Sequence, residues 1–592
     1  MVLRLKFNSR TDIITAFLLL GIAAIIIRLF QLQIIDHQQY VLMANAEHIS
    51  RLTIPARRGR IFAMDRGVPA PLVKNNLVYT VFLDPHDIAR ADNAEAVERI
   101  IREVAGGNIT QDLREAIART NSRYQVVAAR LSRTQAEMIK AENLRGVGFH
   151  ERTERVYIEN SLAAQTLGFV NHEGVGQYGV EETFESRLRG RDGLLQTVTD
   201  VNQVPLTIGD NNIFRPAVHG EDIVLTIDKN IQFITERYLR AGLERLNVDR
   251  GSVIVMDPQT SAILAVANYP SYNPAEFHRV EDASLFFNPA LSAPFEPGST
   301  IKTFTIALGL DRGVITPQTT YLNRDCVPIE DRQICNAPAS RGLNNQTFTM
   351  QHAFNRSLNT GMIDIAQRLD GTNNTQTITR ASRDIIFDYF HDKFGFGRRT
   401  GIELYEAAGL IPRPDIPGAA VSYSNMTFGQ GMNITLIQTA NAFNSLINGG
   451  RFIEPSILAG TMEDDRFIPS PPRSYRQTIS AETSAFMRTV LTDARSSAWF
   501  SRYDRPGFMI GGKTGTSEML LLNEHGVLEY RMDSTIATYI GFGGDTEPRY
   551  TIMIKVYNST PGVTLEGALA AQPIFTDISN WLIQYLNLRP RG

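Results

Sequence analysis

The stretch Glu296-Pro297-Gly298-Ser299-Thr300-Ile301-Lys302, followed by an apolar run over residues 303–310, decides how this chain is interpreted. A Pro-Gly turn leads into a helix-like segment whose first turn carries Ser299, and helical spacing places Lys302 on the same face. A lysine that burial or a second cation keeps neutral can take the proton of a serine hydroxyl and make it a nucleophile. By itself, the spacing favours a capped helix with a surface lysine, so the rest of the chain has to decide.

Composition narrows the possible functions. A length of 592 residues predicts two or three folded domains. A formal net charge of −3 without a Lys/Arg-rich block argues against a nucleic-acid partner. The ten histidines lack metal-ligand spacing, so a metal site is not expected. No cofactor is expected either. Cys326 and Cys335 allow two readings, a short-loop disulfide outside the cytoplasm or a pair of free thiols.

The N-terminal region predicts a membrane anchor. Residues 13–35 form an apolar run of the length that crosses a bilayer, with Arg28 able to extend its head group to the interface. Positive charges at Arg4, Lys6 and Arg10 precede the run, so the positive-inside rule places residues 1–12 in the cytoplasm and the bulk of the chain outside. A cleaved signal peptide is disfavoured, because its small-residue site at residues 44–46 lies too far beyond the apolar run.

Two regions follow the anchor. Residues 36–220, which we call the pedestal, are rich in arginine and contain no catalytic constellation; a strand is expected at 77–83 and a helix at 93–103. Residues 221–592 have longer apolar runs and carry every motif with chemical meaning. The pedestal is therefore expected to hold the second region in place or to bind a partner.

The second region predicts an α+β fold. Segments 252–256 and 262–267 read as a hairpin of buried strands, and three further strands are expected at 509–516, 535–542 and 550–557. Short connections suggest antiparallel neighbours, which gives one sheet of about five strands with the intervening helices on its faces. An amphipathic stretch at 575–588 could cover one of these faces.

Two further motifs follow Ser299. Ser357-Leu358-Asn359 lies between helical stretches, and Lys513-Thr514-Gly515-Thr516 closes a predicted strand. Each has an ordinary explanation when taken singly, as a helix cap or as a strand end with a turn residue. In this order, however, they match the Ser-x-x-Lys, Ser-x-Asn, Lys-Thr-Gly set of penicillin-interacting serine acyltransferases.

Each motif residue has a physical role in such a site. Lys302 can accept the Ser299 proton, and Ser357 can relay it to a leaving amine. Asn359 can hold Lys302 and substrate amides by hydrogen bonds. Lys513 can attract a substrate carboxylate and lower the pKa of the other lysine through like-charge repulsion.

The strand that carries Lys513 is expected to bind the substrate. Gly515 leaves its edge bare for a peptide, and the hydroxyls of Thr514 and Thr516 can bind a carboxylate. The backbone N–H groups of Ser299 and Thr516 are the expected oxyanion hole.

With these motifs, the chain resembles a class B penicillin-binding protein, a monofunctional D,D-transpeptidase of peptidoglycan synthesis. The resemblance spans nearly the whole chain and includes these further segments: 28–33, 55–61, 179–181, 225–228, 256–258, 394–397 and 428–431. It implies a penicillin-binding transpeptidase fold on an elongated pedestal of the dimerisation type, with one transmembrane helix. It also implies that Ser299 attacks the penultimate D-Ala of a stem peptide, releases the terminal D-Ala and passes the acyl group to another strand's amine, and that β-lactams block this serine.

The resemblance also implies a place in the cell. The protein would lie in the bacterial plasma membrane with its catalytic domain outside the cytoplasm, beside a polytopic lipid-II glycosyltransferase and other division or elongation proteins. Its size, the absence of appended C-terminal domains and the segment 539–544 favour the septal type over the lateral-wall type. Two departures from the family pattern stand out: Leu358 fills the middle of its motif, unlike the Asp of class A β-lactamases, and segment 62–67 differs from the usual pedestal sequence.

Three alternatives fit less well. A β-lactamase-like hydrolase needs a water-activating carboxylate that the sequence does not reveal. A β-lactam-sensing receptor needs a cytoplasmic output domain, and only about a dozen residues precede the apolar run. A bifunctional synthase needs a glycosyltransferase domain, and the pedestal carries no matching carboxylate motif.

Overall fold

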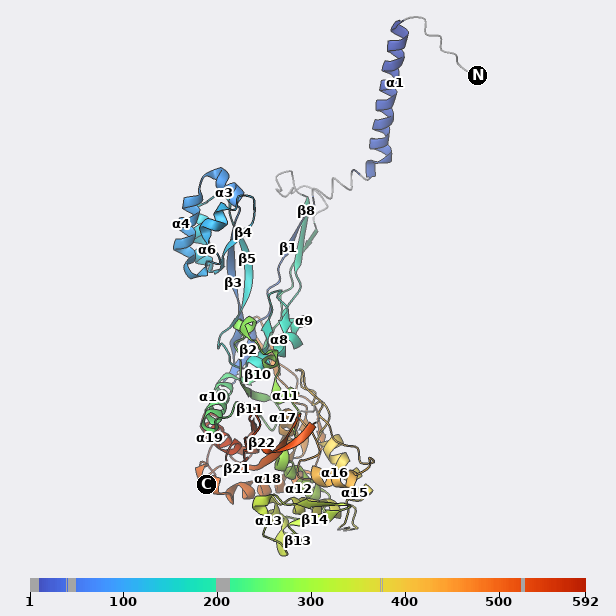
Figure 1. Ribbon diagram of the computed structural model, residues 1–592, viewed down its shortest axis with the longest axis vertical. Helices are drawn as coiled ribbons and strands as arrows, with labels where there is room; N and C mark the ends of the chain where they lie inside the picture. The colour runs from blue at the N-terminus through green and yellow to red at the C-terminus, as the bar shows by residue number, and fades with distance from the viewer. Residues whose placement is uncertain are drawn as a thin grey trace, which may run out of the picture. The chain divides into compact units, whose positions relative to one another are not determined.

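The computed structural model describes residues 10–38, 40, 49–198, 213–372, 374, 376–522 and 528–591. The chain divides into two compact units, residues 1–58 with 189–220 and residues 59–188 with 221–592 (Figure 1). The predicted cytoplasmic segment, residues 1–12, lies mostly outside the described residues.

The first unit contains the predicted apolar helix. Helix α1 (Arg10–Phe30) continues into a short π-helical turn (Gln31–Ile35). Within the described part of the chain, residues 13–35 are the one helical stretch long and apolar enough to cross a membrane. The same unit holds a three-stranded sheet in the order β1 (Ile49–Ile54), β8 (Gly193–Val198) and β9 (Ile213–Arg215).

The second unit begins with a domain that we call the head, residues 61–157. Its sheet strands are β2 (Ile61–Asp65), β3 (Val68–Leu83), β4 (Gln125–Leu131) and β5 (Val147–Tyr157). Its helices are α3 (Pro85–Ala91), α4 (Ala94–Ala105), α5 (Leu113–Ala118) and α6 (Arg133–Ala141), which enclose a small apolar core against the strands. The strand expected at 77–83 and the helix expected at 93–103 are both confirmed as parts of β3 and α4.

The head shares its sheet with later sequence. Strand β10 (Asp222–Asp228) pairs in parallel with β2, and β18 (Leu458–Glu463) and β19 (Arg466–Pro469) extend the sheet beyond it. One continuous sheet therefore crosses residue 220, where the sequence places a domain boundary. That boundary itself stays a prediction.

The catalytic-region sheet has the predicted five antiparallel strands. Their order is β12 (Ile263–Tyr269), β11 (Arg250–Met256), β23 (Pro548–Tyr557), β22 (Leu528–Gly544) and β21 (Met509–Leu522). Because side chains alternate along a strand, Val253 and Val255 join the core with helices α10 (Lys229–Leu246) and α19 (Ala571–Tyr585). Ile254 and Met256 face the other way, into the larger core that contains α12 (Lys302–Asp311) and α17 (Leu436–Ile447).

Strand β21 is longer than the sequence predicted. The predicted strand ends at Thr516, whereas β21 continues to Leu522 because β22 starts at Leu528 and pairs with it along that whole length. In the sheet order β21 is an edge strand. The motif at 513–516 therefore lies within the strand, with an edge available beside it.

Candidate active site

Ser299 lies in a single 3-10 turn, Gly298–Ile301, that leads directly into α12. Gly298 has φ +61°, a conformation that other residues adopt at a cost. A Cβ atom on Gly298 would also lie 2.5 Å from the main-chain oxygen and 3.1 Å from the main-chain nitrogen of Thr516. Glycine is thus required here because β21 packs directly on the turn that carries the serine.

Two more glycines, Gly429 and Gly515, pack against this turn. Gly298 N–H donates to the carbonyl of Gly429 over 3.1 Å, and a Cβ on Gly429 would meet Gly298 O at 2.0 Å. A Cβ on Gly515 would lie 2.3 Å from Thr538 Oγ1 and 2.9 Å from Pro297 O. The serine turn is therefore held between β21 and the turn at 428–431, and this close approach is an additional reason for glycine at 515.

Lys302 is the first residue of α12, and its side chain is fully buried. Its Nζ donates to Ser357 O (2.5 Å), Asn359 Oδ1 (2.7 Å) and Ser357 Oγ (3.2 Å). Burial and the nearby charge of Lys513 lower its pKa well below the usual value for a lysine. The lowered pKa makes Lys302 a candidate base one helical turn from Ser299. Ser299 is not among its hydrogen-bond partners within the described residues, and catalytic hydrogen bonds often tighten only with substrate.

Ser357 connects the two lysines. It lies in the turn between α13 (Met350–Asn355) and α14 (Asn359–Arg368) with φ +58°, a strained backbone conformation of the kind that clusters at functional sites. Its Oγ accepts from Lys513 Nζ over 2.9 Å as well as from Lys302. Burial lowers the pKa of Lys513 to about 7. The Ser357 hydroxyl can therefore relay a proton between Lys302 and Lys513.

Asn359 rests on a small hairpin that the sequence did not connect with the site. Its Oδ1 accepts from Lys302, and its Nδ2 donates to the main-chain oxygen of Cys335 over 2.9 Å. Cys335 ends the second strand of the hairpin β14 (Cys326–Ile329) and β15 (Arg332–Cys335), and a disulfide joins it to Cys326. The cysteine pair therefore supports the amide that orients Lys302.

The residues expected to bind substrate follow on β21. Thr516 is exposed, and its Oγ1 accepts from Gly567 N–H over 3.2 Å. Thr514 is half-buried. The main chains of Thr516 and the serine turn lie close together, as the contacts of Gly298 require. Their role as oxyanion hole and carboxylate site stays a prediction.

Glu296 precedes the serine turn, and the sequence motifs assign it no role. The Glu296 side chain is buried, and its Oε1 accepts from Gly431 N–H (2.8 Å) and from the Tyr530 hydroxyl (2.7 Å). Burial raises the pKa of this carboxyl. Glu296 thus joins the serine turn to the 428–431 turn and to β22, a contact between segments more than a hundred residues apart that local sequence patterns do not encode.

Potential metal ligands cluster elsewhere in the described part of the chain. Among the described residues, one group could hold an ion, the Asp84, His86 and Asp87 cluster around the start of α3 in the head. None of the motif residues belongs to it.

Comparison with known proteins agrees with the geometry. The domain described as penicillin binding protein transpeptidase matches residues 251–580, and the penicillin-binding protein dimerisation domain matches residues 53–225. Stage V sporulation protein D of Bacillus subtilis is 26% identical over 97% of this chain and 86% of that protein. Peptidoglycan D,D-transpeptidase FtsI of Buchnera aphidicola is 26% identical over 98% of this chain and 96% of that protein. The crystal structure of penicillin binding protein 3 from Mycobacterium tuberculosis, complexed with aztreonam, superposes with a TM-score of 0.66 at 24% identity, covering 91% of this chain and 98% of that one.

Proposed function

Because the transpeptidase match spans more than half of its length, the chain belongs to the penicillin-binding protein transpeptidase family, and we propose that it cross-links peptidoglycan stem peptides through a Ser299 acyl-enzyme. The observation that carries this proposal is the buried network in which Ser357 Oγ accepts from both Lys302 and Lys513, next to the serine turn. A hydrolase or a receptor of the same family could share this network. The experiment must therefore show whether the acyl group stays on the serine or is released by hydrolysis.

In the first half-reaction, Ser299 Oγ attacks the carbonyl carbon of the penultimate D-Ala, and neutral Lys302 takes its proton. The resulting oxyanion is stabilised by the main-chain N–H groups of Ser299 and Thr516. The C–N bond to the terminal D-Ala then breaks, and the leaving amine takes up a proton through Ser357.

In the second half-reaction, the amine of a neighbouring stem peptide attacks the Ser299 ester. It loses a proton to the Lys302 and Ser357 pair while the ester C–O bond breaks and Ser299 regains its hydrogen. The ammonium form of Lys513 and the hydroxyls of Thr514 and Thr516 hold the substrate carboxylate. A β-lactam, which the mycobacterial relative binds as aztreonam, would acylate Ser299 in the same way and block the site.

We further propose that residues 13–35 anchor the protein in the plasma membrane, with residues 1–12 inside and the catalytic domain outside.

The segment 539–544 favours a septal role, beside a polytopic lipid-II glycosyltransferase, over a lateral-wall role. Imaging a fluorescent fusion tests this choice, because exclusive lateral signal would exclude the septal role.

Acylation by a fluorescent penicillin tests the nucleophile. The wild-type protein should form a stable covalent adduct, and Ser299→Ala should form none. Persistent labelling of Ser299→Ala would refute the assignment, and rapid release of hydrolysed drug from the wild-type protein would favour a β-lactamase-like hydrolase instead.

A further inference from the structure

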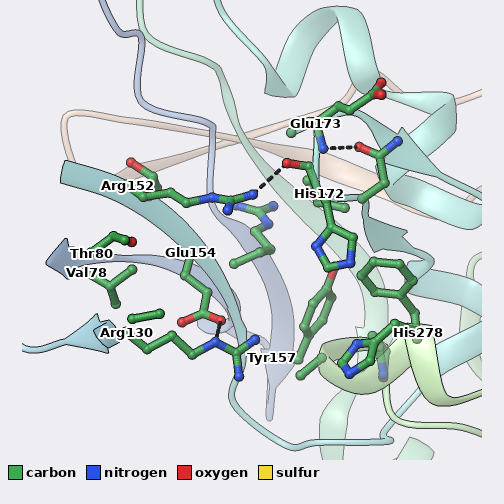
Figure 2. Close-up of a pocket in the computed structure, with 18 residues that line it drawn as sticks. Val78, Thr80, Arg130, Arg152, Glu154, Tyr157, His172, Glu173 and His278 are labelled. Atoms are coloured by element: carbon green, nitrogen blue, oxygen red, sulfur yellow. Dashed lines mark hydrogen bonds and ion pairs between the residues drawn. The ribbon is translucent and has the colours of Figure 1, made fainter. Parts of the chain in front are cut away.

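A cavity of about 470 Å³ lies where the head meets the catalytic region, away from Ser299 (Figure 2). Its walls come from β3, β4 and β5 of the head, from the turn at 171–174, and from the 3-10 helix η3 (Pro274–Arg279). No residue of the serine, lysine or asparagine motifs lines it. A volume in this range suits a small organic ligand rather than a bare ion.

Two arginines present their side chains at this cavity. Arg152 Nη2 donates to the neutral main-chain oxygen of His172 over 2.6 Å, and no carboxylate pairs with Arg152 in the part of the chain that the structure describes. Arg130 Nε pairs with Glu154 over 2.8 Å, but its side chain stays 62% exposed, so its guanidinium can also reach a ligand in the cavity. Arg130 also has φ +59°, a strained conformation for this residue type.

Two imidazoles complete the exposed wall. The ring centroids of His172 and His278 lie 6.1 Å apart, and both residues are exposed. Figure 2 shows the Glu173 carboxylate directed away from the Arg152 and His172 side chains. Glu154 is therefore the only acid that faces these groups among the cavity residues that the structure describes, and Arg130 already neutralises it.

Two more hydrogen-bond donors lie deeper in the cavity. Arg155 and Tyr157 also line the cavity, and the Arg155 side chain is only 5% exposed. Arg155 pairs with Glu181 through Nε, but its Nη2 has no hydrogen-bond partner in the described residues. The Tyr157 hydroxyl also lacks one, although the Val170 main chain faces it, and burial raises its pKa well above the usual value, so it remains a donor.

We propose that this cavity binds an oxyanion, a carboxylate or a phosphate ester, carried by a small organic ligand. A guanidinium group binds either oxyanion through two parallel hydrogen bonds, made by Nη2 together with Nε or Nη1. Nη2 of Arg152 carries two N–H groups, and the one that does not donate to His172 can form such a pair. Because Arg152 lies on β5 and His278 on η3, a ligand that reaches both would join the head to the catalytic region. The inference is independent of the acyl-transfer chemistry and involves no covalent step.

Calorimetry on the full chain in detergent tests this proposal with glycerol 3-phosphate and with citrate as probes. At least one probe should bind saturably at a single site with a Kd of about 1 mM or tighter. Arg152→Gln should weaken that binding by about tenfold or more, because it removes a charge-assisted contact, and Arg152→Lys should retain part of it.

Arg114→Gln is the matched control. Arg114 lies on the head with a side chain 79% exposed and outside the cavity lining, so this variant loses the same charge and should bind within about twofold of wild type. Binding of the phosphate ester alone or of citrate alone identifies the oxyanion and supports the proposal. Absence of saturable binding by both probes, or equal weakening by Arg152→Gln and Arg114→Gln, overturns it.

Discussion

The catalytic region and the head bury cations in opposite ways. Lys302 is fully buried with hydrogen-bond acceptors but without a carboxylate partner in the described residues, and its neighbour Lys513 is a like charge. Arg155 of the head is almost equally buried, but its Nε lies 2.7 Å from the fully buried Glu181. Burial beside a like charge favours the neutral amine, whereas burial beside a carboxylate favours the ion pair. The arrangement around Lys302 favours a base. The Arg155–Glu181 ion pair instead links the two segments that carry these residues.

Removing the Lys302 side chain should have the largest effect. Lys302→Ala should lower the rate of acylation by a fluorescent penicillin about 10²–10⁴-fold, because general-base catalysis is lost. Lys555→Met is the control, since Lys555 is also buried with a pKa lowered to about 8 but makes no hydrogen bond to Ser357 in the described residues. A Lys302→Ala rate within about tenfold of wild type would contradict the assigned role.

Breaking the ion pair should affect stability and leave catalysis intact. Glu181→Gln should lower the free energy of unfolding by about 3–5 kcal/mol, because Arg155 then stays buried without its counter-charge. Glu137→Gln removes an exposed partner of Arg133 and should cost less than about 1 kcal/mol. Chemical denaturation measures both, and the acylation rate of the folded fraction should be unchanged. Equal losses from the two variants would show that burial of the pair does not matter.

A smaller expected effect is a shift in the pH dependence of acylation. The pKa of Lys302 is lowered, so its neutral fraction and the acylation rate should rise as pH increases through that pKa. Lys513→Met removes the like charge and should move the midpoint of this profile upward by about one pH unit. Rates between pH 5 and 10 give the midpoint, with Lys555→Met as the unshifted reference. A midpoint that stays in place would mean that burial alone sets the pKa of Lys302.

Lys513 also links pH to stability. Its folded pKa of about 7 lies below its unfolded value, so the unfolded chain binds more protons between the two. Stability should therefore rise with pH from about 7 to about 10. Thermal unfolding at several pH values in wild type and Lys513→Met separates this contribution from those of other groups.

The sequence predicts the motifs and the sheet well because both are local patterns. Apolar runs at 252–256 and 550–557 indicate buried strands, and the order of three short motifs indicates one cleft. Local patterns do not predict the left-handed backbone at Ser357 or the hydrogen bond from Asn359 to the Cys335 carbonyl. They depend on packing between distant segments, as does the bond from Glu296 to Gly431, and no local pattern records them.

The three interlocked glycines around the serine turn also limit how this cleft can change under selection. A side chain at residue 298, 429 or 515 would collide with main-chain or Thr538 atoms at 2.5 Å or closer, so substitution there would displace the nucleophile itself. An inhibitor that contacts only this glycine-lined part of the cleft would leave few routes to resistance. Escape would have to arise where a side chain has space, such as at the exposed Thr516.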